Sequence, residues 1–525
     1  MAPRYYERLS AVDSSFFLFE SPDAHMHVAA LGVFRTEAPS AGPGALKIAL
    51  LRDHVESRLH LFPRYRKRLD FTPIQRHPIW VDDDCFNLAY HVRHTALPSP
   101  GDQQELNDLA GRIMSAQLDH KKPLWELWLI EGLEGGRFAL LAKVHHCMVD
   151  GASGVDLLTA LLSPARGETF APPEPWSPQP APSRLDLLSE EIRYSAGRPL
   201  AALRAVREAL RRPEEASTRF TESAQAVWQA LAAGLRVPPD TPLNRPIGTH
   251  RRLDWCSIGL AEVKNVKRNL HGTVNDVVLT VVTGALRKFL KARRVPLAKL
   301  DLRVAIPVNM RSSQDDMKAA NRVSALFLSL PIAEHDPLRQ FEKIRTETER
   351  LKRSGAAQGL DLFTRFMDWS RWDLLTYWGV RLVSAAHPFN MVVTNVPGPQ
   401  FPLYLLGRPL EALYPHIPLF ENQGMGVAVM SYLGTVCFGL TADWDLVPDL
   451  SVFARAIDSS FAELAAAAEK CASPRGGEIR GRSRSVPAPA PDPGADPGTP
   501  GAPPGSARGP ARRPSSQRAR RVRTR

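Results

Sequence analysis

The chain of 525 residues has few cysteines and no long apolar run. Its five cysteines are scattered and never spaced Cys-x-x-Cys, which argues against a disulfide framework or a zinc site and fits a reducing cytosol. The apolar stretches fall well short of the roughly 18–20 residues that a membrane span needs. The start, MAPRYYERLSAVDSSFF, has no apolar core followed by a small-residue cleavage site. We therefore expect a cytoplasmic protein without a secretory signal.

The formal net charge is +12, but little of it lies in the part of the chain expected to be globular. The segment 472–525 carries twelve arginines against three acidic residues, so it holds nine of these net charges. The rest of the chain is nearly neutral, which argues against a nucleic-acid-binding body. Because 472–525 is rich in Pro, Gly, Ala, Ser and Arg and almost free of aliphatic residues, it predicts a disordered tail.

The length suggests more than one globular core, and composition breaks show where the cores divide. A Pro-rich connector at 163–184 precedes two segments with helical spacing, Leu185–Arg211 and Phe220–Leu235, and a second break follows them. These breaks predict an N-terminal lobe over 1–165, a Pro-rich and helical crossover over 166–244, a C-terminal lobe over 245–471 and the tail over 472–525.

Short β-rich runs and helical periods occur in both lobes without a steady βαβ alternation, so we predict a mixed α/β (α+β) fold. The predicted strands are Met26–Phe34, Phe138–Val144, Leu302–Pro307, Ala325–Leu330, Met391–Asn395 and Thr435–Thr441. The predicted helices are Ala45–Leu59, Gln103–Gln117 and Val274–Leu290.

The run HHCMVDG, from His145 to Gly151, directly follows a predicted strand and precedes a helix-like segment. Adjacent side chains on an extended backbone point to opposite sides, so the two histidines are poor joint ligands for one metal ion. Only one of them can face a given substrate, and the other must pack within the lobe. A neutral imidazole near its ordinary pKa suits removal of a proton from an alcohol. A lone histidine at a strand end is more often structural.

Two further residues complete the pattern. Asp150 is placed to fix the loop by a hydrogen bond or an ion pair, and Gly151 permits a close approach that a side chain would block. The full HHxxxDG pattern matches acyltransferases of the chloramphenicol acetyltransferase-like fold, in which the second histidine is the base. Since that superfamily includes condensation domains of peptide assembly lines, the motif indicates a chemistry but not a substrate.

Over about residues 5–470 the sequence resembles the bacterial wax ester synthase/diacylglycerol acyltransferase family. Many short motifs in one order are far more specific than any one of them. The segments that carry the resemblance are LSAVDSSFFLFE (9–20), MHV (26–28), FPRYRKRL (62–69), WVD (80–82), YHVRH (90–94), PLWE (123–126), PLNRPIG (242–248) with Arg251-Arg252, TVNDVVL (273–279), PVNMR (307–311), NR (321–322), NVPGP (395–399) and GMGVAVMSYLG (424–434).

The resemblance implies two chloramphenicol acetyltransferase-like lobes, with His146 as the general base and His145 and Asp150 as supports. Asn275 and Asp276 match the family's ND pair. Asn275 could orient the thioester oxygen, because catalysis needs a dipole where negative charge develops. Asp276 is a candidate for substrate binding. For both residues, an N-cap with a first-turn acid is an equally good interpretation.

A third family motif falls on Pro123, Leu124 and Trp125, which with Gly151 are candidates for substrate binding. A buried aromatic corner is at least as good an interpretation of this motif. Cys147 lies beside the base, but no separate base is evident for it, so we do not expect a nucleophile there.

The resemblance further implies direct transfer from acyl-CoA to an alcohol, with no acyl-enzyme, no metal and no cofactor beyond the acyl-CoA substrate. The acceptor would be diacylglycerol, giving triacylglycerol, or a long-chain alcohol, giving a wax ester. Such acceptors lie in a membrane or lipid inclusion, so we expect peripheral association with the inner membrane face or with inclusions, to which the arginine-rich tail could contribute. The sequence does not indicate an oligomeric state.

Two other functions remain open. One is a condensation-type enzyme acting on carrier-bound acyl groups, although the chain has no carrier module with a phosphopantetheine serine. The other is a non-catalytic protein of lipid inclusions, against which the intact HHxxxDG and ND patterns argue.

Overall fold

The computed structural model describes residues 6–36, 46–148, 156–167, 175–196, 241–309, 323–353 and 389–472, all within one compact unit, Met1–Ser473. The principal elements before the crossover are α1 (Ala11–Phe19), β2 (His27–Arg35), α2 (Ile48–Arg58), β3 (Lys67–Phe71), β4 (Pro78–Asp82), β5 (Val92–Ala96), α4 (Gln103–Ser115), β6 (Trp125–Leu133), β7 (Arg137–His145), the 3-10 turn η3 (His146–Met148) and α5 (Asp156–Ala160), and α6 (Arg184–Ala196) lies within the crossover.

The principal elements after the crossover follow. They are β8 (Arg251–Gly259), α9 (Leu260–Asn269), α10 (Val274–Ala292), β9 (Leu302–Asn309), β10 (Val323–Leu330), α11 (Pro337–Arg353), β11 (Met391–Pro397), β12 (Tyr404–Leu405), β13 (Arg408–His416), β14 (Met425–Tyr432), β15 (Thr435–Asp443) and α14 (Leu450–Ala472).

The first six-stranded sheet carries the histidine pair and has the order β12-β13-β2-β7-β6-β5. Its central strands β2 and β7 run antiparallel, in a register that sets His27 opposite His145. Apolar side chains cover both faces: Leu51 and Val55 of α2 belong to the cluster on one face, and Ala110 and Ile113 of α4 to the cluster on the other. The end of β7 is therefore held inside a sheet that is packed on both sides.

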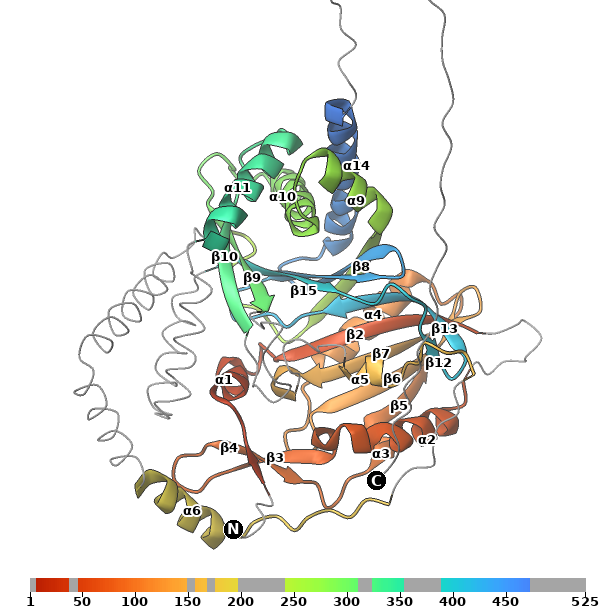
Figure 1. The fold of residues 1–525 in the computed structure, drawn as a ribbon, viewed down its shortest axis with the longest axis vertical. Coiled ribbons are helices and arrows are strands. Elements are labelled where there is room, and N and C mark those ends of the chain that lie inside the picture. Colours follow the sequence, from red (N-terminus) through yellow and green to blue (C-terminus); the bar gives the residue numbers. More distant parts are fainter. Residues whose placement is uncertain are drawn as a thin grey trace, which may run out of the picture. The chain divides into compact units, whose positions relative to one another are not determined.

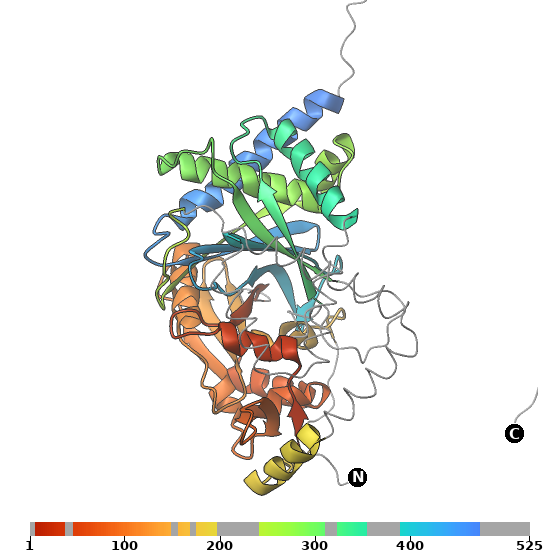
Figure 2. The same cartoon turned by 90° about the vertical axis from the view of Figure 1, so that its left-hand side faces the viewer.

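The second six-stranded sheet has the order β10-β9-β11-β14-β15-β8. Helices α9, α10, α11 and α14 gather on one face of it in both views (Figures 1 and 2). Its apolar core includes Val278 and Leu286 of α10 and Phe453 of α14. Helix α10 begins with a capping box in which Thr273 and Asp276 satisfy each other's main-chain N–H groups. Local sequence signals thus agree with the fold at this helix.

The predicted elements are confirmed at the level of existence and type. Every strand and helix predicted in the two lobes is present, with ends that differ by a few residues. In the predicted crossover, α6 confirms the start of Leu185–Arg211 as helical. Phe220–Leu235 and 473–525 lie outside the described residues, so the prediction of a disordered tail stays a prediction.

One strand pairing crosses the predicted boundary between the two lobes. Strands β12 and β13, from residues 404–416, pair with the N-terminal sheet, where Leu413 lies opposite Gly32. In this position β13 supplies hydrogen-bond partners for the main-chain groups along the edge of β2, which would otherwise lack a neighbouring strand. The two sheets are also in direct contact. A Cβ added to Gly439 of β15 would lie 1.7 Å from the carbonyl oxygen of Pro415 on β13, so only a glycine fits there. The boundaries of the lobes otherwise remain predictions.

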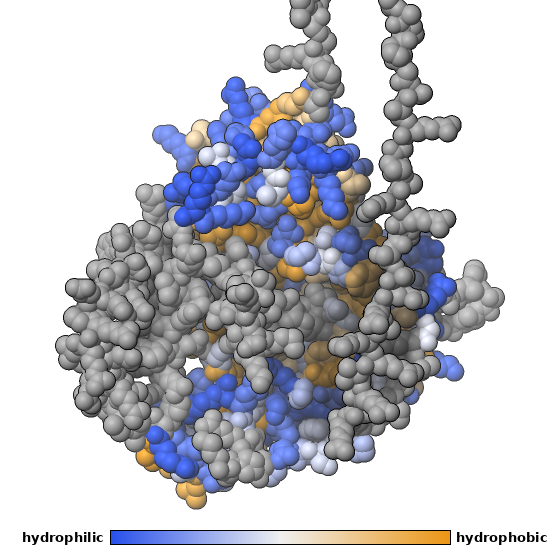
Figure 3. Space-filling model, in the orientation of Figure 1, coloured by the Kyte–Doolittle hydropathy of each residue, from blue (hydrophilic) through white to orange (hydrophobic). Residues whose placement is uncertain are grey.

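On the face shown in Figure 3, hydrophilic residues predominate over the helices that cover the second sheet, and hydrophobic residues gather in a band below them. Some of the large apolar side chains are individually exposed, among them Val396 and Trp444. Among the helices within the described ranges, none is long and apolar enough to cross a membrane.

Candidate active site

The histidine pair lies where β7 passes into η3, and the neighbouring strands hold its main chain. The His145 N–H donates to the Leu124 carbonyl at 3.0 Å, just before β6. The His146 N–H donates to the Met26 carbonyl at 2.8 Å, just before β2. The two successive N–H groups are therefore bound to opposite neighbours, which fixes two different directions for the two side chains.

Helix α1 covers both imidazoles with two consecutive phenylalanines. Phe16 stacks on His146 with ring centroids 3.9 Å apart and an interplanar angle of 17°. Phe17 stacks on His145 at 4.5 Å and 10°. These contacts limit rotation of each ring about its Cβ–Cγ bond. The segment LSAVDSSFFLFE, which marked the family resemblance, thus supplies an aromatic cover for the site.

The hydrogen-bond partners of His145 show which ring nitrogen carries the proton of its neutral imidazole. Its side chain has no exposed surface, and its Nδ1 accepts a hydrogen bond from the Cys147 N–H at 3.2 Å. An acceptor nitrogen in a neutral imidazole leaves the proton on the other nitrogen, Nε2. That Nε2 lies 3.5 Å from Oε2 of Glu20. Burial lowers the pKa of His145, and the Glu20 carboxylate opposes this shift only in part. His145 is thus held neutral and oriented, and the supporting role predicted for it stays a prediction.

Glu20 faces His145 from the end of α1, and the sequence alone predicts no role for it. Its side chain is 5 % exposed, and Oε2 lies 3.0 Å from Nε2 of His120. Burial alone would raise the pKa of Glu20, but contacts with His120 and His145 hold it below its usual range. The pKa of His120 is raised in turn, chiefly by its contact with the Glu20 carboxylate. The sequence signals for it are its place at the end of the family segment LSAVDSSFFLFE and its charge directly after the apolar run FFLF.

His146 differs from its neighbour because it is half-buried rather than fully enclosed. Its Nδ1 is buried and has no hydrogen-bond partner among the described residues. Burial lowers the pKa of His146 to about 4, against a smaller opposite effect of its own main-chain carbonyl. The imidazole is therefore neutral around pH 7 and can accept a proton. This is the state that a general base requires.

Cys147 is unsuited to nucleophilic attack. The residue has no exposed surface, and burial raises the pKa of its thiol well above the ordinary value. A buried thiol with a raised pKa stays protonated at neutral pH, whereas the nucleophile would be the thiolate. The geometry thus agrees with the expectation that Cys147 is not a nucleophile.

The PLW motif forms the buried start of β6. Leu124 and Trp125 have no exposed surface, and Pro123 is buried as well. The indole Nε1 of Trp125 donates to the Tyr65 carbonyl at 2.8 Å, while the Leu124 carbonyl accepts the N–H of His145. The motif supports the histidine pair through the main chain, as the buried-corner interpretation requires. Contact of these residues with a substrate stays a prediction.

The ND pair opens α10, and its two members differ sharply. Asp276 is 2 % exposed; its Oδ2 accepts the Thr273 N–H at 2.8 Å, and its Oδ1 accepts the Thr348 hydroxyl at 2.9 Å. This is the first-turn acid of a capping box. Asn275 is half-buried, and its amide has no hydrogen-bond partner within the described ranges. Its amide N–H groups are thus available to a ligand, and the substrate roles of both residues remain predictions.

Two predicted site residues cannot be placed. Asp150 and Gly151 fall in 149–155, outside the described residues. Searching the described part of the chain, we find no cluster of three or more His, Cys, Asp or Glu side chains that could hold a metal ion. The absence of metal and cofactor from the reaction stays an expectation.

Comparison with known proteins now identifies the family. A family model described as the wax ester synthase/diacylglycerol acyltransferase catalytic domain matches residues 9–278, and one described as the WS/DGAT C-terminal domain matches residues 319–465. The chain belongs to the wax ester synthase/diacylglycerol acyltransferase family. The resemblance seen in the motifs is thereby confirmed, and the protein is an acyltransferase.

Relatives match along most of their own length. A Mycobacterium tuberculosis protein named "Probable diacyglycerol O-acyltransferase tgs1" is 31% identical, over 88% of this chain and 96% of that protein. The "O-acyltransferase WSD" of Acinetobacter baylyi is 30% identical, over 84% and 93%. The solved wax ester synthase/diacylglycerol acyltransferase of Marinobacter aquaeolei VT8 is 27% identical with a TM-score of 0.63, over 88% of this chain and all of that one. The predicted chloramphenicol acetyltransferase-like fold is confirmed.

Proposed function

We propose that this protein transfers a long-chain acyl group from acyl-CoA to the hydroxyl of diacylglycerol, of a long-chain alcohol, or of both. The products are triacylglycerol and wax ester. The proposal is supported by the names of the relatives, which describe diacylglycerol acyltransferases and wax ester synthases. The observation that carries the chemistry is a half-buried, neutral imidazole at position 146, directly after β7, that stacks on Phe16.

In this proposal Nε2 of His146 is the basic atom, because Nδ1 is buried. It takes the hydroxyl proton as the alcohol oxygen attacks the thioester carbonyl carbon. The resulting tetrahedral adduct expels the coenzyme A thiolate, and the imidazolium returns the proton to that sulfur. One C–O bond forms, one C–S bond breaks, and no acyl-enzyme is needed. General-base catalysis of this type contributes about 10²–10⁴-fold to the rate.

The other site residues have separate roles in the same step. Glu20 and His145 keep the wall behind His146 rigid, since Glu20 is buried against Nε2 of His145. Asn275 donates to the thioester oxygen as it gains negative charge, which an amide without another described partner can do. Asp150 anchors the loop and Gly151 admits the substrate, as the family motif implies.

Acyl-CoA and a lipid acceptor are the proposed partners. We place the protein in the cytoplasm, at the inner membrane face or on lipid inclusions, because both acceptors reside in a lipid phase. The arginine-rich tail would contribute about 1 kcal/mol per basic residue near an anionic surface. Nucleic acid is not a proposed partner.

The test is release of free thiol from palmitoyl-CoA by the purified protein, with diolein or hexadecanol as acceptor. We expect release with at least one acceptor, together with the matching ester product. A condensation-type enzyme would instead require the acyl group on a carrier protein. No thiol with either acceptor would contradict the proposal and favour the carrier-dependent or the non-catalytic function.

A further inference from the structure

Arg251, the first residue of β8, is a buried cation that contacts both lobes. The residue is 4 % exposed. Its guanidinium donates through Nη1 to the carbonyls of Gly248 at 2.5 Å and His250 at 3.1 Å, and through Nη2 to the carbonyl of Asp23. Asp23 lies in the loop between α1 and β2, 228 residues away in sequence. One planar group therefore joins the start of β8 to an N-terminal loop.

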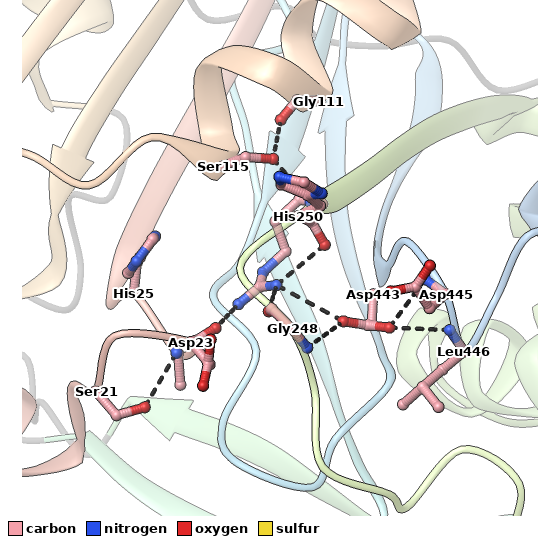
Figure 4. A network of polar contacts seen from close by, with 12 residues as sticks. Ser21, Asp23, His25, Gly111, Ser115, Gly248, His250, Asp443, Asp445 and Leu446 are labelled. Atoms are coloured by element: carbon pink, nitrogen blue, oxygen red, sulfur yellow. Dashed lines mark hydrogen bonds and ion pairs between the residues drawn. The ribbon is translucent and has the colours of Figure 1, made fainter.

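Asp443, at the end of β15, fixes the guanidinium from the side of the second sheet. It is 1 % exposed, and its Oδ2 lies 3.9 Å from Nη1 while accepting the Gly248 N–H at 2.8 Å. Its Oδ1 accepts the N–H groups of Asp445 and Leu446 at 3.1 and 2.9 Å (Figure 4). Arg251 and Asp443 are also register partners in the β8–β15 ladder. The buried charge is thus paired and held at a defined position.

The main chain of Arg251 makes a second connection to the N-terminal lobe. Its N–H donates to Oγ of Ser115 at 2.8 Å, and that hydroxyl donates to the Gly111 carbonyl at 2.7 Å within α4 (Figure 4). A Cβ on Gly111 would lie 2.8 Å from the Arg251 carbonyl oxygen, so helix and strand are in direct contact. Side chain and main chain of one residue therefore hold two N-terminal elements.

The segment that Arg251 holds also carries contacts to both active-site histidines. Three residues before Asp23 is Glu20, which faces His145. Three residues after it is Met26, whose carbonyl accepts the His146 N–H. Between them a tight turn links Ser21 and Ala24 through two main-chain hydrogen bonds of 3.1 and 3.2 Å. A shift of Asp23 would also move Glu20 and Met26, because the hydrogen-bonded turn between them is rigid.

We propose that Arg251 is a positioning residue for acyl transfer: by binding the Asp23 carbonyl from β8, it sets Glu20 against His145 and Met26 against His146. The role rests on the proposed function of His146 as base. It requires the guanidinium fork, because one group must reach several carbonyls in different directions, which an ammonium does not reproduce. Arg251 itself does not touch the reacting atoms.

The decisive experiment is a double-mutant cycle of Arg251→Met and Glu20→Gln, read as kcat and as KM for palmitoyl-CoA on folded, monodisperse protein. We expect Arg251→Met to lower kcat about 10-fold, with KM changed less than about 2-fold. The kcat of the double variant should lie within about 2-fold of the kcat of the slower single variant. The losses overlap because both variants release the same segment. Arg251→Lys should retain the charge and still lose kcat.

A matched control is Arg287→Met on α10. Arg287 also donates to two main-chain carbonyls, those of Ile332 and Ala333, but within the second lobe. In the double variant Arg287→Met/Glu20→Gln, the fold-loss in kcat should equal the product of the two single losses. If Arg251→Met does not fold, Asp443→Asn replaces it, and a smaller loss that overlaps with Glu20→Gln is expected.

Unchanged kcat in Arg251→Met or Arg251→Lys, or losses that multiply with Glu20→Gln as they do for Arg287→Met, would overturn the role of Arg251. Those outcomes leave the wild-type activity intact. Absence of thiol release by the wild type would instead remove the proposed function, so the two failures are distinguishable.

Discussion

The end of β7 and the start of α10 both present a pair of adjacent polar residues, and in each pair the members differ. His145 and Asp276 are buried, and their polar atoms contact other groups of the described chain through hydrogen bonds or, for Nε2 of His145, through the Glu20 carboxylate. His146 and Asn275 are half-buried, and neither side chain has a hydrogen bond to another described residue. A motif can thus combine one residue that builds the element with one that is available for chemistry. The half-buried member of each pair is the better candidate for contact with substrate.

The largest expected effect is that of His146→Ala. Loss of the base should lower kcat by about 10²–10⁴-fold. The melting temperature should fall less than in His145→Ala, because the half-buried His146 ring loses its stacking on Phe16 but no described side-chain hydrogen bond. His145→Ala is the comparison: it removes a fully buried ring and should lower the melting temperature while leaving part of the activity. Thiol-release assays give kcat, and thermal unfolding gives the melting temperature, for both variants. Equal turnover of His146→Ala and wild type would refute the assignment of the base.

Next in size is Asn275→Ala. If its amide stabilises the developing oxyanion, kcat should fall about 10²-fold or more, while stability changes by less than about 0.5 kcal/mol. Asp276→Ala should do the reverse: the loss of the capping box and of the bond to Thr348 should cost about 1–2 kcal/mol in urea unfolding, with kcat per folded molecule nearly unchanged. Wild-type kcat in Asn275→Ala would leave the ND pair purely structural.

Glu20→Gln has a smaller expected effect. The substitution keeps the shape but removes the carboxylate that faces His145 and His120, so kcat should fall about 10- to 100-fold. Glu131→Gln is a matched control, because Glu131 contacts His94 at 2.7 Å in a pair whose two side chains are more exposed than those of Glu20 and His145. Steady-state kinetics of the two variants check the prediction. A loss of similar size in both would mean that the charge at position 20 has no special role.

The sequence predicts the elements that carry the site better than it predicts the contacts between them. The end of β7, the histidine order and the start of α10 depend on patterns within a few neighbouring residues, so they can be read locally. The contacts of Glu20 with His145 and of Arg251 with Asp23 join residues far apart in the chain, and no local period encodes such pairs. The same applies to β13, whose place beside β2 follows from sheet pairing rather than from its own composition.

The pH dependence of kcat/KM tests the central claim most directly. Burial sets the pKa of His146 to about 4, below the ordinary 6.5, so the base form is complete at neutral pH and is lost only as the pH falls toward 4. His91 and His416, also with pKa about 4, and Glu20, below its usual range, lose stabilisation as the pH falls, so rates need short assays after a jump from pH 7. We expect kcat/KM to stay constant from pH 8 to about 5.5 and to decline below that. An acidic limb centred near pH 6.5 that disappears in His146→Ala would contradict a base with a lowered pKa at this position.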